Sequence, residues 1–69
     1  MINIELTGKQ NHILAIAKKY GIITIHHVEE IYQSKDNSII ALNELVQLGL
    51  IQNSQGLWRI TEKGRDYRT

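Results

Sequence analysis

The stretch of sequence that decides the fold runs from residue 34 to residue 60 and reads SKDNSIIALNELVQLGLIQNSQGLWRI. In its first half, small and apolar residues recur every three or four positions, which is the spacing of one helix face. This face, which we expect to point inward, consists of Ser38, Ala41, Leu42 and Leu45. The pattern predicts a helix over about residues 35–48, with Ser34 as its N-cap in a turn formed by residues 34–37 and with Gly49 as its stop.

After Gly49 the period of the apolar pattern falls to about two residues. Two short alternating segments, 50–53 and 57–60, flank the sequence Ser54-Gln55-Gly56. A glycine in that place suits a turn that needs a positive φ, so we expect an antiparallel hairpin. Thr61 and Glu62 then have the character of a cap and an acidic first turn, which predicts a short helix through Tyr67.

Upstream of residue 34 the sequence predicts two more helices and a strand stub. Thr7 and Gln10 have the spacing of a capping box, so we expect a helix from there to about Lys19. Residues 22–24 are long enough only for a stub, and a second helix follows at about 25–33. The inner faces should comprise Ile13, Leu14, Ile16, Ala17 and Tyr20 of the first helix and Val28, Ile31 and Tyr32 of the second. The predicted fold class is mainly α with a small β-hairpin.

Length and composition limit the number of domains and the kinds of site that the chain can have. A length of 69 residues allows one domain, over residues 1–69, and the absence of cysteine excludes disulfides, thiolate metal sites and a cysteine nucleophile. No apolar run approaches the length of a membrane-spanning helix, so we expect no membrane association and a cytoplasmic or nucleoid-associated protein. Met1 resembles a native start, and the chain is expected to be either a small whole protein or one domain of a longer one.

The net charge of +1 is unevenly distributed. Residues 1–58 hold four lysines against five acidic residues, a net charge of −1, whereas residues 59–69 hold four basic residues against two acidic ones, a net charge of +2. All three arginines lie in that last segment, and the arginine side chain is well shaped to bind phosphate. The end of the chain is therefore either a place for an anionic partner or a solubilising tail.

Over residues 22–67 this order of elements resembles the winged helix-turn-helix family, in particular the MarR-like and related small prokaryotic, archaeal or viral transcriptional regulators. Two motifs carry the resemblance: Leu48-Gly49-Leu50-Ile51, where the third helix enters the hairpin, and Ile60-Thr61-Glu62-Lys63-Gly64-Arg65 after it. The resemblance implies a three-helix bundle, an antiparallel wing of two or three strands and a short C-terminal helix.

By the same resemblance, the helix at 35–48 should lie in the major groove of double-stranded DNA while the wing and the basic end hold the backbone. The predicted DNA-binding residues are Ser34, Lys35, Asn37, Ile39, Ile40, Asn43, Arg59, Lys63, Arg65 and Arg68. Lys9, Lys18 and Lys19 are weaker candidates. The expected wing tip, residues 53–56, carries no basic residue, which leaves Arg59 as the nearest cation.

Ile39 and Ile40 leave an alternative open. They could touch thymine methyl groups, but an exposed apolar pair also marks protein interfaces. The alternative function is therefore a protein-interaction module that docks through Ile39, Ile40 and Val46, and a homodimer built on the same residues is a third possibility. The lone Trp58 is expected to pack beneath the wing rather than to stack on bases.

Nothing in the sequence predicts catalysis or a cofactor. No nucleophile stands beside a recognisable base, and no glycine-rich phosphate loop is present. His26 and His27 are adjacent, so on a helix they point about 100° apart and cannot chelate one ion together. We expect these histidines and His12 to be solvated or to face phosphate, with no metal site and no enzymatic activity.

Overall fold

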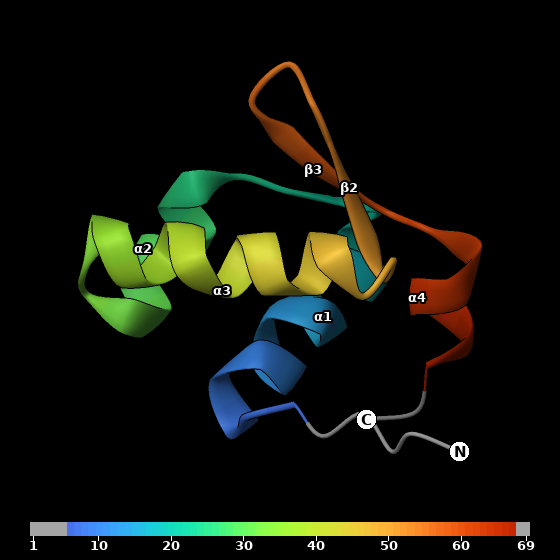
Figure 1. The fold of residues 1–69 in the computed structure, drawn as a ribbon, viewed down its shortest axis with the longest axis horizontal. Helices are drawn as coiled ribbons and strands as arrows, with labels where there is room; N and C mark the ends of the chain where they lie inside the picture. Colours follow the sequence, from blue (N-terminus) through green and yellow to red (C-terminus); the bar gives the residue numbers. More distant parts are fainter. Residues whose placement is uncertain (1–5, 68–69) are drawn as a thin grey trace.

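The computed structural model describes residues 6–67 and is mainly helical, with one small antiparallel sheet (Figure 1). Its elements are α1 (Gly8–Tyr20), β1 (Ile22–Ile23), α2 (Ile25–Tyr32), α3 (Lys35–Gln47), β2 (Ile51–Ser54), β3 (Leu57–Ile60) and α4 (Glu62–Asp66). The strand order is β1-β3-β2, so the stub at residues 22–23 adds a third strand to the hairpin. None of the helices within residues 6–67 is long and apolar enough to cross a membrane.

The helix ends follow the predicted caps. The Thr7 hydroxyl accepts from the Gln10 backbone N–H at 3.1 Å, and the Gln10 side chain accepts from the Thr7 N–H at 3.1 Å, which confirms the capping box. Ser34 accepts from the Asn37 N–H at 3.3 Å and caps α3. The helix start predicted at about residue 35 is confirmed, but the expected four-residue turn over 34–37 is wrong, because only Gln33 and Ser34 connect α2 to α3. Gln33 makes this short turn by adopting a left-handed conformation with φ of 55°.

The hairpin turn is also tighter than predicted. Ser54 pairs with Leu57 as the last rung of the β2–β3 ladder, so the turn contains only Gln55 and Gly56. Both have positive φ, 52° for Gln55 and 81° for Gly56, which is the pattern of a type I′ turn. This turn matches the twist of the strands, and the hairpin projects beyond the helices (Figure 1).

The core lies between α1, α2, α3 and the sheet. The inward face predicted for α3 is confirmed, because all four of its residues are buried. The buried hydrophobic residues are Ile13, Leu14, Ala17, Ile23, Val28, Ala41, Leu42, Leu45, Leu50 and Ile51. Trp58 and Tyr32 are half-buried and pack against this cluster. The prediction for Tyr20 is wrong: its side chain is 63% exposed at the end of α1, with the Lys19 ammonium 5.3 Å from its ring centroid.

A close approach of backbones fixes α4. The Thr61 hydroxyl donates to the Gly49 carbonyl at 2.5 Å and accepts from the Gly64 N–H at 3.0 Å. A β-carbon at Gly64 would overlap the Leu50 carbonyl oxygen and lie 2.7 Å from the Ile60 Cδ1 atom. Position 64 therefore needs glycine because of packing alone.

Candidate nucleic-acid interface

Helix α3 lies at the surface between α1 on one side and the hairpin on the other (Figure 1). Successive residues of an α-helix point about 100° apart, so the exposed residues of α3 divide into separate rows. Asn37, Ile40 and Glu44 line a cleft that α3 forms with α1. Lys35, Ile39 and Asn43 follow one another at four-residue spacing on the side turned away from that cleft.

The row of Lys35, Ile39 and Asn43 is open to a partner. All three residues are exposed, Ile39 to 37%. The Lys35 ammonium and the Asn43 amide form no hydrogen bond or ion pair with any residue between 6 and 67. An amide can read an adenine edge and an ammonium can meet a phosphate, so this row has the chemistry of a DNA contact. Gln47, which the sequence prediction missed, is exposed one turn beyond Asn43.

The exposed residues of the β2–β3 hairpin are polar, and few of them are charged. Residues 52–56 are all exposed, and none of them is charged. Arg59 lies on β3, where its backbone pairs with Ile22 on one side and Gln52 on the other. Because Trp58 packs against the core, its neighbour Arg59 points to the opposite, outer face of the sheet. The Arg59 side chain is exposed there.

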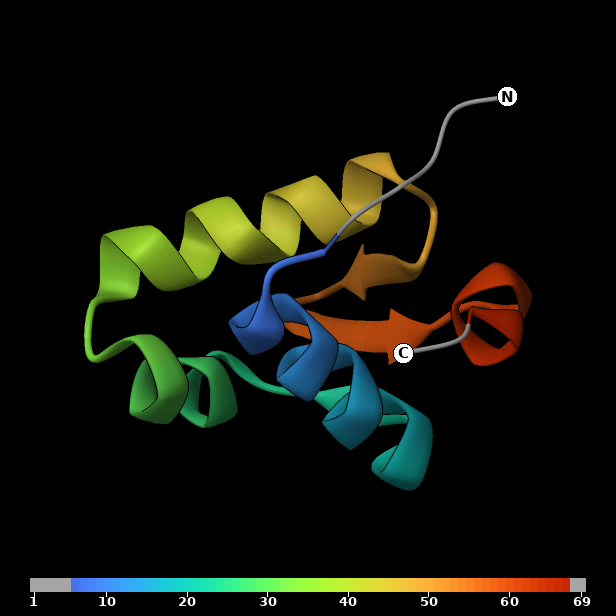
Figure 2. The same ribbon diagram turned by 90° about the horizontal axis from the view of Figure 1, so that it is seen from below.

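The predicted basic residues of the C-terminal segment lie away from the row of Lys35, Ile39 and Asn43. Lys63 and Arg65 are exposed on α4, and a β-carbon on Gly49 would lie 3.6 Å from the Lys63 Cδ atom. These cations therefore lie near the C-terminal end of α3, and α4 and the α2–α3 turn are at opposite ends of the molecule (Figure 2). Helix α3 has 13 residues and is therefore about 20 Å long, so the cations near its C-terminal end are far from Lys35 at its N-terminal end. Arg68 lies outside the described residues.

Several other candidate side chains already have partners. The Ser34 hydroxyl caps α3. Among the lysines of α1, Lys18 donates to the Tyr67 carbonyl and the Lys9 ammonium lies 5.1 Å from the Tyr32 ring centroid. The His27 Nδ1 atom accepts from the Thr24 backbone N–H at 3.2 Å, so this histidine completes the cap of α2. Between residues 6 and 67, no three His, Cys, Asp or Glu side chains form a group that could hold a metal ion.

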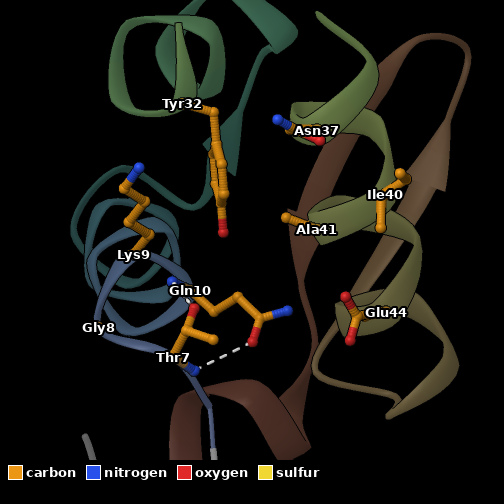
Figure 3. A pocket seen from close by; sticks show the side chains of 9 residues that line it. All are labelled: Thr7, Gly8, Lys9, Gln10, Tyr32, Asn37, Ile40, Ala41 and Glu44. Atoms are coloured by element: carbon orange, nitrogen blue, oxygen red, sulfur yellow. Dashed lines mark hydrogen bonds between the residues drawn. The ribbon is translucent and has the colours of Figure 1, made fainter. Parts of the chain in front are cut away.

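The cleft on the other side of α3 was not predicted (Figure 3). Its volume is about 630 Å³, and its lining residues are Thr7, Gly8, Lys9, Gln10, Tyr32, Asn37, Ile40, Ala41 and Glu44. One feature of the sequence could have indicated this cleft: Gln10 is a polar residue on the face of α1 whose other members, Ile13, Leu14 and Ala17, are apolar and buried. The capping box explains only one end of the Gln10 amide.

Comparisons with protein-family models, with curated proteins and with solved structures give no match to this chain.

Proposed function

We propose that the protein is a winged-helix DNA-binding domain and acts as a small transcriptional regulator. In this proposal α3 lies in the major groove of double-stranded DNA, and the β2–β3 hairpin is the wing that follows the backbone. The observation that carries the proposal is the exposed, unpartnered row of Lys35, Ile39 and Asn43 on a surface helix beside a projecting polar hairpin.

The connection between α2 and α3 supports this proposal. Two helices joined by a short turn can place the second helix in a groove while the first crosses the backbone. Here the turn consists of Gln33 and Ser34, and α2 and α3 pack closely against each other. The buried face of α3 holds the helix firmly, so the opposite face is presented in a fixed orientation.

The small number of cations near α3 predicts a modest affinity for DNA. Lys35 and Arg59 are the cations nearest the proposed contact surface, while Asp36 and Glu44 are acidic residues on α3 itself. Each neutralised phosphate contributes about 0.9 to the slope of log K against log salt. With two or three phosphates contacted, we expect a slope of about −2 to −3.

The alternative, a protein-docking stripe of Ile39, Ile40 and Val46, has a specific observation in its favour: Ile40 is 57% exposed. However, Ile40 lines the cleft beside α1, and Val46 is half-buried against the core. Ile39 and Ile40 thus point to different sides of α3, which argues against one docking stripe and against a homodimer built on it. DNA binding by the row of Lys35, Ile39 and Asn43 is the better-supported function.

The test is a fluorescence-anisotropy titration of a labelled random-sequence duplex at about 50 and 200 mM salt, followed by selection of a preferred sequence. We expect binding that weakens with salt and a loss of about 1–3 kcal/mol for Asn43→Ala on the selected sequence. The control is Asn53→Ala in the wing, which should preserve sequence preference. Binding that is absent at low salt would overturn the proposal, and a search for a protein partner of Ile39 and Ile40 would follow.

A further inference from the structure

We infer that the DNA site preferred by this protein consists of A·T base pairs, which Ile39, Asn43 and Gln47 of α3 contact in the major groove. This inference rests on the proposed DNA binding and specifies the bases that such binding selects. It depends on which side chains α3 presents to a partner and on the absence of arginine from that helix.

The three side chains form one exposed row. Ile39, Asn43 and Gln47 follow one another at four-residue spacing, so they lie on the same side of α3 in successive turns. All three are exposed. Neither side-chain amide forms a hydrogen bond with any residue between 6 and 67. Because the opposite face of α3 is buried in the core, the row is presented in a fixed orientation with its amides available to bases.

The two amides of the row match adenine. In the major groove adenine presents the N7 acceptor beside the N6 amino donor, and a side-chain amide supplies one donor and one acceptor to pair with both. Guanine presents two acceptors, which suit arginine or lysine, and the only cation of α3 is Lys35 at its first residue. Glutamate can accept from cytosine, but Glu44 lines the cleft on the α1 side of the helix. Asn43 and Gln47 therefore favour adenine over the other bases.

The aliphatic member of the row matches thymine. Thymine carries a C5-methyl group in the major groove, and contact with an apolar side chain removes that methyl group from water. Ile39 is 37% exposed and lies one turn before Asn43 in the same row. Ile40 is more exposed, at 57%, but it lines the cleft beside α1. We therefore assign the thymine contact to Ile39.

Helix geometry sets the spacing of the contacted bases. Four residues of an α-helix span about 6 Å, so neighbouring members of the row are about 6 Å apart along α3. Base pairs repeat about every 3.4 Å along a duplex, so neighbouring members contact bases about two steps apart. The row from Ile39 to Gln47 thus covers about four or five base pairs, with the thymine contact at one end.

The experiment measures the binding of four duplex pools by fluorescence anisotropy at about 50 mM salt. The pools share their flanks and differ in a random central segment of about eight base pairs, made only of A·T, A·U, G·C or inosine·C pairs. Uracil lacks the thymine methyl group, and an inosine·C pair has the major-groove pattern of G·C with the minor-groove pattern of A·T. We expect the A·T pool to bind most tightly and the A·U pool about fourfold more weakly, as expected for the loss of one buried methyl group. The G·C and inosine·C pools should both bind about tenfold more weakly than the A·T pool.

Three variants assign these preferences to residues. Ile39→Ala should bind the A·T and A·U pools equally, whereas Ile40→Ala, the matched control from the cleft side of α3, should keep the difference of about fourfold. Asn43→Ala should lose most of the preference for A·T over inosine·C and keep the preference for A·T over A·U. Circular dichroism establishes that each variant is folded.

The possible results separate this inference from the proposed function. Binding that weakens with salt but is equally tight for all four pools would overturn the base preference and leave the proposed DNA binding standing. An inosine·C pool that binds as tightly as the A·T pool would place the preference in the minor groove, which contradicts contact by α3. Loss of the methyl preference in Ile40→Ala but not in Ile39→Ala would overturn the assigned row. Absence of binding to every pool would overturn the proposed function together with this inference.

Discussion

Gly64 lies so close to the Leu50 carbonyl that no β-carbon fits between the two backbones. This contact joins α4 to the segment between α3 and β2, and the Thr61 hydroxyl reinforces it by bonding to Gly49 and Gly64. The Lys63-Gly64-Arg65 part of the sequence, which resembles a family motif, thus has a packing reason for its glycine, whatever its cations contact.

The first prediction is that Gly64→Ala destabilises the protein by about 2–3 kcal/mol, because the new methyl group forces α4 away from Leu50. Urea unfolding monitored by circular dichroism measures the change. Gly8→Ala is the control: nothing lies within 4 Å of a β-carbon there, so its stability should stay the same or rise slightly. Equal stability of the two variants would contradict the close contact.

The second prediction concerns the hairpin turn. Gln55 adopts φ of 52°, a conformation that asparagine tolerates better than glutamine, so Gln55→Asn should stabilise the protein by about 0.5–1 kcal/mol. Thermal unfolding provides the measurement. Gln52→Asn, on the regular part of β2, should give no such gain. A loss of stability in Gln55→Asn would mean that the turn is not of type I′.

A third prediction separates capping by Ser34 from contact with DNA. Ser34→Ala should lose about 1 kcal/mol of stability because the Asn37 N–H loses its acceptor, whereas Ser34→Asp should retain the cap. If α3 enters the major groove, the new carboxylate of Ser34→Asp should nevertheless lower DNA affinity through repulsion by phosphate. Urea unfolding and anisotropy are measured on the same samples. An unchanged DNA affinity of Ser34→Asp would mean that DNA does not contact the N-terminal turn of α3.

The fourth prediction depends on the proposed DNA binding and concerns which lysine would contact phosphate. Lys35→Gln should reduce the salt slope of DNA binding by about 0.9, the contribution of one phosphate contact. Lys19→Gln is the matched control, because the Lys19 ammonium lies over the Tyr20 ring at the far end of α1. Anisotropy at several salt concentrations gives both slopes. A decrease for Lys19→Gln and none for Lys35→Gln would place the nucleic acid on α1 instead of α3.

Local interactions are what the sequence by itself determined. Thr7 and Gln10 cap α1 as predicted, and Ser38, Ala41, Leu42 and Leu45 form the buried face of α3. Caps involve atoms within three residues of each other, and a buried face follows from helical periodicity, so both are encoded in short stretches. The turns were predicted one or two residues too long because Gln33 and Gln55 adopt positive φ without the usual glycine or asparagine.

Only the tertiary structure decided the features that depend on distant segments. Ile22 and Ile23 become a third strand because Arg59 and Trp58 pair with them across the sheet. Tyr20, the last residue of α1, is exposed although the periodicity places it inward. The predicted cations are dispersed along the molecule, and Gln10 and Glu44 line the same cleft, because packing fixes how α1, α3 and α4 lie against one another. No short stretch of sequence determines how these separate helices lie relative to one another.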